Sequence, residues 1–503
     1  MLLLSRFKWQ TRVFLALAFS LLLVLSASSF AFASGKLVQL SSDPYTNPDS
    51  QHMTQVEPDT FAFGNTIVSA FQSGRYFDGG ASNIGFATST DGGKTWTHGF
   101  LPGTTIFATP PGPDQYHRAS DASVAYDARH KVWIISYLAF FSGFAVRDDV
   151  LVSRSTDGGH TWGLPVPVNT SGDSNDKNWT VCDDSTSSPF YGNCYTEFDD
   201  FSNNNLVQMS TSTDGGSTWG AAKTTADQAS VIGGQPLVQP NGTVIVPITV
   251  FRANFTIVDI AAFRSTDGGA SWSSTVTISP LSTFFENASM RDGSGLASAE
   301  IDGSGKVYVV WQDCRFEPNC STNYGSANDI VMSTSTDGVT WSAVQRIPID
   351  PVGSGINHII PGIGVDKKTS GNHAHLALAY YYFTDAACFT YNCQLNVGFV
   401  SSTNGGASWS AAQQLAGPMS MLWLADTTGG FMVGDYISTS IVGDDAFPAF
   451  AVATAPSGGF LNEAMFTVAD QDLKVVGGSI TSSGDTAVIA QSQSNGSFPR
   501  TER

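Results

Sequence analysis

Basic residues are scarce in this chain of 503 residues. Lysine and arginine together number 24, against 43 aspartates and glutamates, so the formal net charge is −19. The first 33 residues hold three basic residues and no acidic one, and without them the charge is −22. Such a charge repels phosphate backbones and anionic lipid headgroups. We therefore expect neither a nucleic acid nor a membrane as partner, and an anionic ligand would need a local group of cations.

The chain also lacks the short motifs of several large enzyme classes. It has no glycine-rich phosphate loop followed by a helix, no His-Glu-x-x-His motif, and no Gly-x-Ser-x-Gly between a strand and a helix. The turn that begins at Asp302 (Asp-Gly-Ser-Gly) is too short for a calcium-binding loop. We therefore expect no cofactor and no metal site.

Beyond the N-terminus, no apolar run is long enough to cross a bilayer. The N-terminal segment has a basic start, an apolar stretch from Val13 to Ala27, and the small-x-small sequence Ala31-Phe32-Ala33. This order predicts a cleaved export signal over residues 1–33 and a secreted protein. A retained N-terminal anchor is the alternative.

The six cysteines all lie in the part predicted to be exported. They form three close pairs along the sequence: Cys182 with Cys194, Cys314 with Cys320, and Cys388 with Cys393. Six cysteines allow 15 sets of pairings, but closeness in sequence favours these three local disulfides in an oxidising compartment. A zinc site is the alternative, and it is disfavoured because no histidine lies at ligand spacing.

What the chain does have is a repeated phrase, Ser-Thr-Asp-Gly-Gly-x-Thr/Ser-Trp, in six near-copies whose third positions lie 53 to 70 residues apart. Each copy follows alternating apolar residues and contains residues that tolerate positive φ, which predicts a β-hairpin turn. The Asp and Ser side chains can bond the N–H groups of their own turn. We expect a structural role for the third positions: Asp91, Asp157, Asp214, Asp267, Asp337 and Asn404.

Ser-x-Asp-x-Gly-x-x-Trp is the Asp box, and the chain resembles the Asp-box (BNR repeat) sialidase-like superfamily of β-propellers. The six copies span nearly the whole predicted mature chain. Asp boxes also occur in propellers with other functions, so the resemblance is specific for architecture. It implies an all-β propeller of four-stranded antiparallel blades over residues 36–470, followed by a partly ordered, Ser/Gly-rich tail over residues 471–503.

The number of blades follows from counting strands. Three strands without an Asp box come after the sixth copy, and a blade needs a fourth. The apolar segment 36–40 is the only spare strand, so we expect a seven-bladed propeller whose last blade is closed by the N-terminal strand, with no open sheet edge. Six blades, as in the sialidases proper, are the alternative.

The turns of a propeller emerge on two faces. Asp boxes occupy one face, and the other predicted face gathers arginines together with acids and aromatic residues. The resemblance to sialidases implies three arginines that grip a substrate carboxylate, and Arg118, Arg291 and Arg315 are the candidates. Further substrate contacts are expected from Arg75, Asp313, His117 and Tyr381.

The resemblance also implies a tyrosine nucleophile activated by a carboxylate, with an aspartate as general acid. The candidates are Tyr436 as nucleophile with Asp435 beside it, Glu286 or Glu317 as its base, and Asp121 or Asp59 as the acid. These assignments rest on the predicted topology, because the Arg-Ile-Pro motif that sialidases carry before the first Asp box is absent. The one such tripeptide, Arg346-Ile347-Pro348, follows the fifth Asp box in an outer strand.

Three functions remain open. The first is a glycoside hydrolase that removes terminal acidic sugars from glycans, and the second is a non-catalytic propeller that binds glycan or protein. The missing Arg-Ile-Pro motif favours the second. The third is a polysaccharide lyase that uses Tyr436 with His117 or His358. A glycan or polysaccharide is the main expected partner, and we expect a monomer.

Overall fold

The computed structural model describes residues 35–141, 147–171, 173–252, 257–284, 289–293, 295–320, 327–385, 388 and 392–487. The described residues form β-strands joined by turns, with three short 3₁₀ helices, η1 (Phe201–Asn203), η2 (Gly371–His373) and η3 (Met421–Trp423). The all-β prediction is confirmed. In these ranges no helix is long and apolar enough to span a membrane. The predicted export signal and the tail from residue 488 lie outside the described residues.

Two sheets contain eight strands each. The first contains β2 (Gln55–Phe63), β3 (Thr66–Arg75), β4 (Ala81–Ser89), β6 (Tyr116–Asp127), β7 (Val132–Phe141), β8 (Asp148–Ser155) and β9 (Val166–Asn169), with β5 (Thr97–Phe100) paired to β4. The second contains β10 (Asn175–Cys182), β11 (Cys194–Asp200), β12 (Leu206–Ser212), β13 (Ser230–Ile232), β15 (Val244–Arg252), β16 (Ile257–Ser265) and β17 (Val276–Pro280), with β14 (Leu237–Val238) paired to β15.

Three further sheets contain four strands each, and one hairpin stands apart. The third sheet contains β18 (Ser298–Ile301), β19 (Val307–Asp313), β20 (Asp329–Ser335) and β21 (Gln345–Arg346). The fourth contains β22 (Asn357–Val365), β23 (Leu376–Phe383), β24 (Gln394–Ser402) and β25 (Gln413–Ser420). The fifth contains β28 (Ser438–Val442), β29 (Asp445–Ala453), β30 (Glu463–Val468) and β1 (Leu37–Gln39), and the hairpin is β26 (Ala425–Thr427) with β27 (Gly430–Met432).

The second strands of three four-strand units are nearly continuous apolar runs. β7, β19 and β23 read VWIISYLAFF, VYVVWQD and LALAYYYF, and nearly all their residues are buried. A strand with neighbours over both of its faces buries side chains of both orientations. This explains why these segments are nearly continuous apolar runs, although their sheets are antiparallel.

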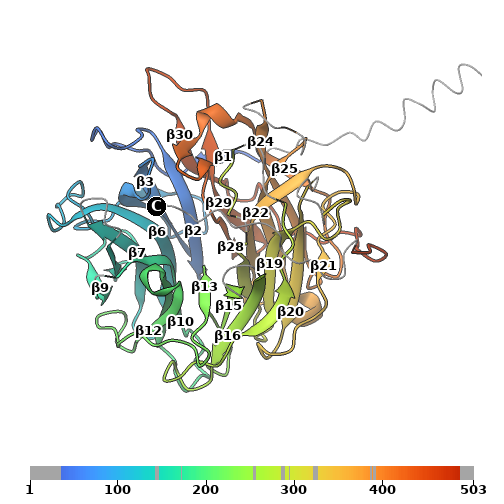
Figure 1. Ribbon diagram of the computed structural model, residues 1–503, viewed down its shortest axis with the longest axis horizontal. Helices are drawn as coiled ribbons and strands as arrows, with labels where there is room; N and C mark the ends of the chain where they lie inside the picture. Colours follow the sequence, from blue (N-terminus) through green and yellow to red (C-terminus); the bar gives the residue numbers. More distant parts are fainter. Residues whose placement is uncertain are drawn as a thin grey trace, which may run out of the picture. The chain divides into compact units, whose positions relative to one another are not determined.

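The four-strand units follow one another in chain order, as the colours of Figure 1 show. Contacts between first strands run from β2 to β6, β10, β14, β18, β22 and β28, and β28 contacts β2 again. The N-terminal strand β1 lies beside β30 and pairs with it antiparallel, Leu37 opposite Val468. The first and the last named strands therefore share one sheet.

The Asp boxes are closed by their own side chains. In the first copy, Asp91 Oδ1 accepts hydrogen bonds from the Ser89 hydroxyl and the Thr95 N–H, both at 2.9 Å. Ser89 Oγ in turn accepts from the Gly93 N–H at 2.8 Å. The bonds donated by Thr95 lower the pKa of Asp91 to about 2. Equivalent bonds form at Asp157, Asp214, Asp267, Asp337 and Asn404.

A glycine of each box also packs against the preceding unit. Gly93 has φ +87°, and a Cβ atom there would lie 2.1 Å from the ring of Phe447 in β29. Gly159 has φ +85°, and its Cβ would lie 2.9 Å from Val68 in β3. The same relation holds for Gly216 with Ile134, Gly269 with Tyr195, Gly338 with Ile245, and Gly406 with Met332. Only glycine both adopts a positive φ without strain and leaves room for the neighbouring side chain. The box therefore sets the spacing between units as well as the turn.

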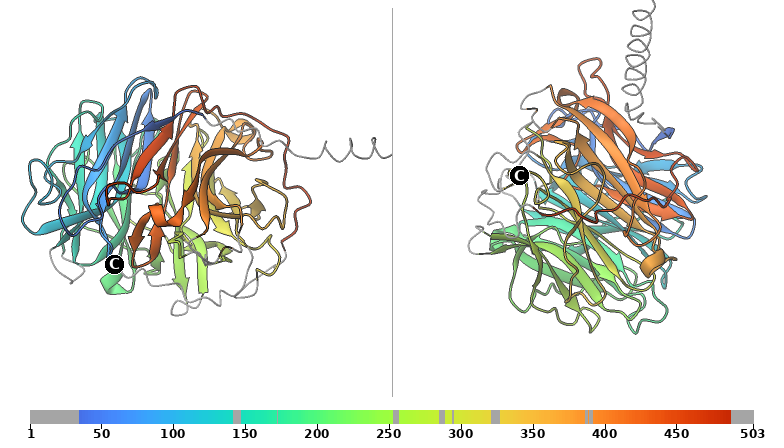
Figure 2. Two further views of the ribbon diagram at one scale, coloured as in Figure 1. Left: turned by 90° about the horizontal axis from the view of Figure 1, so that it is seen from above. Right: turned by 90° about the vertical axis from the view of Figure 1, so that its right-hand side faces the viewer.

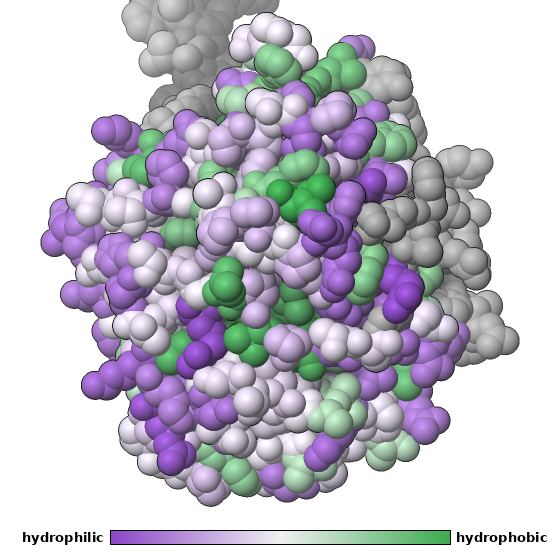
Figure 3. Space-filling model, turned by 90° about the vertical axis from the view of Figure 1, so that its left-hand side faces the viewer, coloured by the Kyte–Doolittle hydropathy of each residue, from purple (hydrophilic) through white to green (hydrophobic). Residues whose placement is uncertain are grey.

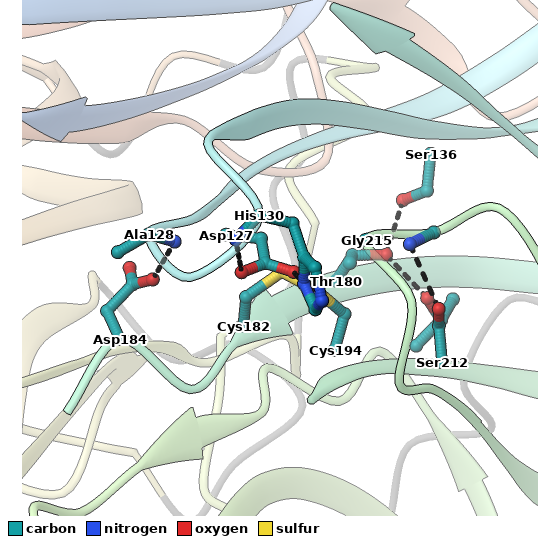
Figure 4. The surroundings of a disulfide bond; sticks show 12 residues. Asp127, Ala128, His130, Ser136, Thr180, Cys182, Asp184, Cys194, Ser212 and Gly215 are labelled. Carbon is teal, nitrogen blue, oxygen red and sulfur yellow. Dashed lines mark hydrogen bonds and ion pairs between the residues drawn. A yellow bond between two sulfur atoms is a disulfide. The ribbon is translucent and has the colours of Figure 1, made fainter. Parts of the chain in front are cut away.

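The three predicted disulfides are confirmed: Cys182–Cys194, Cys314–Cys320 and Cys388–Cys393. The first joins directly opposed residues of β10 and β11. In Figure 4 it lies beside Asp127 and His130, whose Oδ2 and Nδ1 atoms are 2.6 Å apart. Nearby, Asp184 accepts a hydrogen bond from the Ala128 N–H at 2.7 Å. The β6–β7 turn is thereby tied to the segment that follows β10.

The described part of the predicted tail packs against the fifth sheet and then against the fourth. The Lys36 N–H donates to Asp472 at 2.8 Å, and the Ala446 N–H donates to the carbonyl of Leu473 at 2.9 Å. Further along, the Trp409 N–H donates to the carbonyl of Ile480 at 2.9 Å. The described residues in both views of Figure 2 are mostly strands. The segment after β30 bonds to these strands and turns but contains no named strand of its own.

The face drawn in Figure 3 is mostly polar. Hydrophobic residues occur there in small groups separated by hydrophilic ones. A monomeric soluble protein normally leaves such scattered apolar residues exposed. This face therefore gives no sign of a large apolar contact surface.

We expect Asp214→Ala to destabilise the fold by about 1–3 kcal/mol, because the Ser212 hydroxyl and the backbone of the turn lose their acceptor. Asp214→Asn should cost less than about 1 kcal/mol. The sixth box supports this, since Asn404 Oδ1 accepts from the Ser402 hydroxyl and the Ser408 N–H at 2.9 Å each. Denaturant unfolding of both variants measures the difference. Equal losses would mean that the box does not depend on this acceptor.

Candidate functional site

Four first strands, β2, β6, β10 and β22, carry the same irregularity. Their register with the neighbouring strand skips two residues. The first of the two has a positive φ in each case: Glu57 at 54°, Asp121 at 52°, Lys177 at 49° and Ile360 at 49°. In residues other than glycine, each such φ costs on the order of 1 kcal/mol or more. Because strain of this kind gathers at functional sites, the three charged residues mark the first place to look.

Lys177 joins these elements. Its Nζ lies 3.3 Å from Glu57 Oε1, 3.0 Å from Asp121 Oδ1 and 2.6 Å from Asp435 Oδ2. All four side chains are at most 5% exposed. A buried ammonium group needs carboxylates that compensate for its lost hydration. We call Glu57, Asp121, Lys177, Asp435 and Arg291 the Lys177 cluster.

Arg291 completes the cluster from the segment before β18. Its Nε donates to Asp435 Oδ1 at 2.6 Å and its Nη2 donates to Asp435 Oδ2, a bidentate pair. Arg291 is 15% exposed and is the most exposed member. Arg75 lies at the end of β3, where its Nη1 donates to the carbonyl of Gly80 at 2.7 Å. Of the cluster, the Arg291 guanidinium is therefore the group most open to solvent.

The carboxylates of the cluster differ in acidity. Burial raises the pKa of Glu57 to about 7, against the opposing effect of Lys177. Burial would also raise the pKa of Asp435, but Arg291 and Lys177 hold it well below its ordinary value. Asp121 is likewise buried, and Lys177 with the Ser120 hydroxyl keeps its pKa lowered. Neighbouring carboxyl groups with pKa values pushed apart are typical of an acid and base pair.

Tyr436 lies beside the cluster. Lys177 Nζ is 5.5 Å from the centre of its ring, and the Trp179 ring meets it edge to face at 5.2 Å. The hydroxyl donates to the carbonyl of Ala122 at 3.5 Å. Burial raises the pKa of Tyr436 well above its ordinary value, and the Glu57 carboxylate raises it further. These surroundings oppose formation of the phenolate that a nucleophilic tyrosine requires.

The three arginines predicted to form a carboxylate clamp each pair with a different carboxylate. Arg118 pairs with Asp78 at 2.7 Å, and Arg315 pairs with Asp313 at 2.7 Å. Arg291 pairs with Asp435, as described above. Among the contacts of the described residues, none joins two of these arginines. The geometry therefore gives no support to a clamp shared by all three.

Arg315 and Asp313 form a local unit beside the Cys314–Cys320 disulfide. Arg315 Nε donates to Asp313 Oδ1 at 2.8 Å, and Trp311 Nε1 donates to Asp313 Oδ2 at 3.0 Å. Asp313 is fully buried, and Arg315 is 14% exposed. The pair fixes the start of the loop after β19.

The remaining predicted residues have other surroundings. Glu317 is buried and accepts a hydrogen bond from the Gly353 N–H at 3.0 Å. Tyr381 is fully buried, and its hydroxyl donates to the carbonyl of Ala451 at 2.9 Å. His117 is partly exposed in β6. Glu286 lies outside the described residues. Of the predicted site, the structure thus brings together Asp121, Arg291, Asp435 and Tyr436.

Lys177 was missed from the sequence, and Glu57 was not among the predicted catalytic residues. A signal for both exists in the repeat itself. Glu57, Asp121 and Lys177 stand 34, 36 and 37 residues before the third position of the first three Asp boxes. Charged residues at one position of successive repeats converge when the repeats are arranged around a common centre.

A small cavity lies between the first strands. Its volume is about 30 Å³, enough for a few water molecules and too small for a sugar ring. Its lining includes Thr60, Val124, Thr180, Leu237, Ala299, Ile363 and Ser438, one residue from each of the seven first strands. A sugar would therefore have to bind outside this cavity.

Residues 138–362 match the family model of the BNR repeat-like domain. The predicted resemblance to Asp-box proteins is confirmed by this match. None of the curated proteins compared with the chain matches it.

Several solved structures are similar to this one. The α-L-arabinofuranosidase of Fusarium graminearum is 15% identical, with a TM-score of 0.45, over 71% of this chain and 95% of that chain. A Hadza microbial sialidase is 13% identical, with a TM-score of 0.43, over 84% and 68%. An ulvan lyase of polysaccharide lyase family PL25 is 10% identical, with a TM-score of 0.47, over 86% and 96%. Likeness at this level says nothing about the activity of this chain.

The raised pKa of Glu57 predicts a pH dependence of stability. A carboxyl group whose pKa rises from 4.5 to about 7 on folding stabilises the fold while it is protonated, and this contribution is lost as pH rises between those values. Glu57→Gln lacks the effect, so its melting temperature should fall less over this range than that of the unmodified protein. Differential scanning calorimetry between pH 4.5 and 7.5 measures this.

The matched control is Asp91→Asn. Its carboxyl group has a pKa of about 2 in the fold and is ionised across the whole range, so this variant should follow the unmodified protein. A constant difference between Glu57→Gln and the unmodified protein would contradict the assigned pKa.

Proposed function

We propose that this BNR repeat-like chain is a secreted, glycan-active β-propeller. It hydrolyses the glycosidic bonds of terminal acidic sugars at the Lys177 cluster. One observation carries the proposal. Four buried ionisable side chains and the partly exposed Arg291 converge from β2, β6, β10 and the segments before β18 and β28, three of them on strained backbone. Such a charge cluster is costly for stability, and perturbed titratable groups of this kind gather at functional sites.

The proposed architecture has seven blades. Two eight-stranded sheets that each divide into two units, and three four-stranded sheets, give seven units. The contacts that run through seven first strands and return to β2 support a closed ring, with β1 completing the last blade beside β30. The predicted export signal over residues 1–33 and the three disulfides support secretion.

In the proposed chemistry, Glu57 is the general acid. Its pKa of about 7 leaves about half of it protonated at pH 7 and most of it protonated at mildly acidic pH, and a donor to a glycosidic oxygen must be protonated. Asp121 is the ionised partner, held so by Lys177, and acts as base or stabilises positive charge on the sugar ring. Arg291 binds the carboxylate of an acidic sugar in exchange for part of its pairing with Asp435. Tyr436 shapes the site and does not act as nucleophile.

Two alternatives from the sequence fare differently. A non-catalytic glycan-binding propeller is the second candidate, because every charge of the Lys177 cluster already has a partner within the protein. A lyase that pairs Tyr436 with His358 is less supported. The His358 ring packs against Tyr380 and Tyr382, and no contact among the described residues joins it to Tyr436.

The test is turnover of a panel of fluorogenic glycosides by the full secreted chain: a sialoside, a glucuronide and a neutral arabinofuranoside. We expect hydrolysis of an acidic member, and a loss of kcat/KM of at least about 100-fold in Glu57→Gln, because a general acid contributes this much. The matched control is Glu463→Gln, a buried glutamate that accepts a hydrogen bond from the Ala425 N–H. Its kcat should stay unchanged.

Other outcomes would decide against hydrolysis. Binding to an array of acidic glycans without turnover would favour the second candidate. An unsaturated product with near-ultraviolet absorption would indicate a lyase. If the protein neither binds nor hydrolyses any acidic glycan, the proposal as a whole is overturned.

A further inference from the structure

A second group of buried polar side chains lies between β20 and β22. Asp329 begins β20, His358 is the second residue of β22, and Asp350 lies in the link between β21 and β22. One oxygen of each carboxylate and one ring nitrogen of the histidine lie within 4.8 Å of one another. Asp329 and His358 are at most 2% exposed. The proposed sugar site does not use this group.

The hydrogen bond of His358 fixes which ring nitrogen can bind a ligand. Nδ1 lies 3.3 Å from the backbone carbonyl of Asn328, which can only accept, so Nδ1 carries the proton. Burial lowers the pKa of His358, which favours the neutral ring. Nε2 therefore presents a lone pair toward Asp350 Oδ2, at 4.0 Å. Two hydrogen-bond acceptors that face each other in a buried place repel each other unless a proton or a cation lies between them.

The carboxylates are arranged in the same way. Arg346 donates from Nε to Asp329 Oδ1 at 2.7 Å and from Nη2 to Asp350 Oδ1 at 2.5 Å. Each aspartate thus gives one oxygen to Arg346 and keeps Oδ2 for another partner. Asp329 Oδ2 has no hydrogen-bond partner among the described residues, although it is fully buried. Asp350 Oδ2 accepts from the Ser354 hydroxyl.

Negative charge exceeds positive charge around this place. Asp485, from the C-terminal segment, lies 3.6 Å from Arg346 Nη1. Glu317 is buried close to Arg346 and Asp350, and its Oε2 also has no partner among the described residues. Three carboxylates therefore pair with one guanidinium, and the Glu317 carboxyl lies near it.

We infer that Asp329 Oδ2, Asp350 Oδ2 and His358 Nε2 bind one divalent cation. Two carboxylate oxygens with one imidazole nitrogen suit Zn²⁺ or Mn²⁺ better than Ca²⁺, which prefers an all-oxygen shell. The carbonyl of Asn328 holds the histidine, and Arg346 holds both carboxylates, in the manner of outer partners that orient metal ligands.

A cation here ties the β21–β22 link to the two strands beside it. Asp350 and Ser354 belong to that link, whereas Asp329 and His358 belong to named strands. The ion would therefore stabilise the junction between the third and fourth sheets. This role is structural and independent of the proposed hydrolysis.

The test is isothermal titration of the chelator-treated, dialysed full chain with ZnCl₂ and, separately, with MnCl₂. We expect one site per chain for at least one of these ions, with affinity at least about tenfold weaker in Asp329→Asn and His358→Gln. The control is His98→Gln, which removes an exposed histidine of β5 and should leave binding unchanged.

A second measurement needs no variant, which matters because His358 is buried. At a hundredfold excess of the ion over its Kd, the melting temperature of the unmodified chain should rise by about 5 °C and fall back on chelation. Binding weaker than about 1 mM for both ions, or equal binding by His358→Gln, would overturn the inference. If His358→Gln binds the ion equally well, a surface histidine explains the binding. A proton shared by His358 and Asp350 then explains why these two side chains face each other.

Discussion

The ammonium group of Lys177 has almost no contact with water, and three carboxylates from separate segments neutralise it. Glu57, Asp121 and Lys177 itself each lie at a bulge, of β2, β6 and β10 respectively, with backbone in the left-handed region. The strain and the desolvation both oppose folding. Packing of the first strands against one another compensates for them, so the charge cluster and the arrangement of the sheets depend on each other.

The arrangement of the sheets depends in turn on the Asp boxes. The sequence predicts that they are turns closed by their own side chains. The hydrogen bonds of Asp91 and its equivalents confirm this. It does not reveal that Gly93 reaches Phe447 of the last sheet, or that each later box touches the unit before it. Turn chemistry is local and can be read from consecutive residues, whereas these contacts join positions far apart in the chain.

The site was harder to predict for the same reason. The face-by-face sorting of loops places Asp121, Arg291, Asp435 and Tyr436 together, and these four do lie together. It also places Arg118 and Arg315 with them, but each of these finds an acidic partner nearby. Lys177 escapes because a lone lysine in a strand carries no motif. Its position in the repeat, shared with Glu57 and Asp121, is the signal that a comparison of units would have found.

The account is tested most directly by the protonation of Lys177, followed by NMR of selectively labelled lysine side chains, with Lys177→Arg to assign the signal. The three carboxylates raise the pKa of Lys177 well above its ordinary 10.5, although burial alone would lower it. We predict that Lys177 stays charged at a pH where the exposed lysines have lost their protons. Deprotonation at or below 10.5 would mean that the carboxylates do not surround it, and the cluster at the centre of the proposal would not exist.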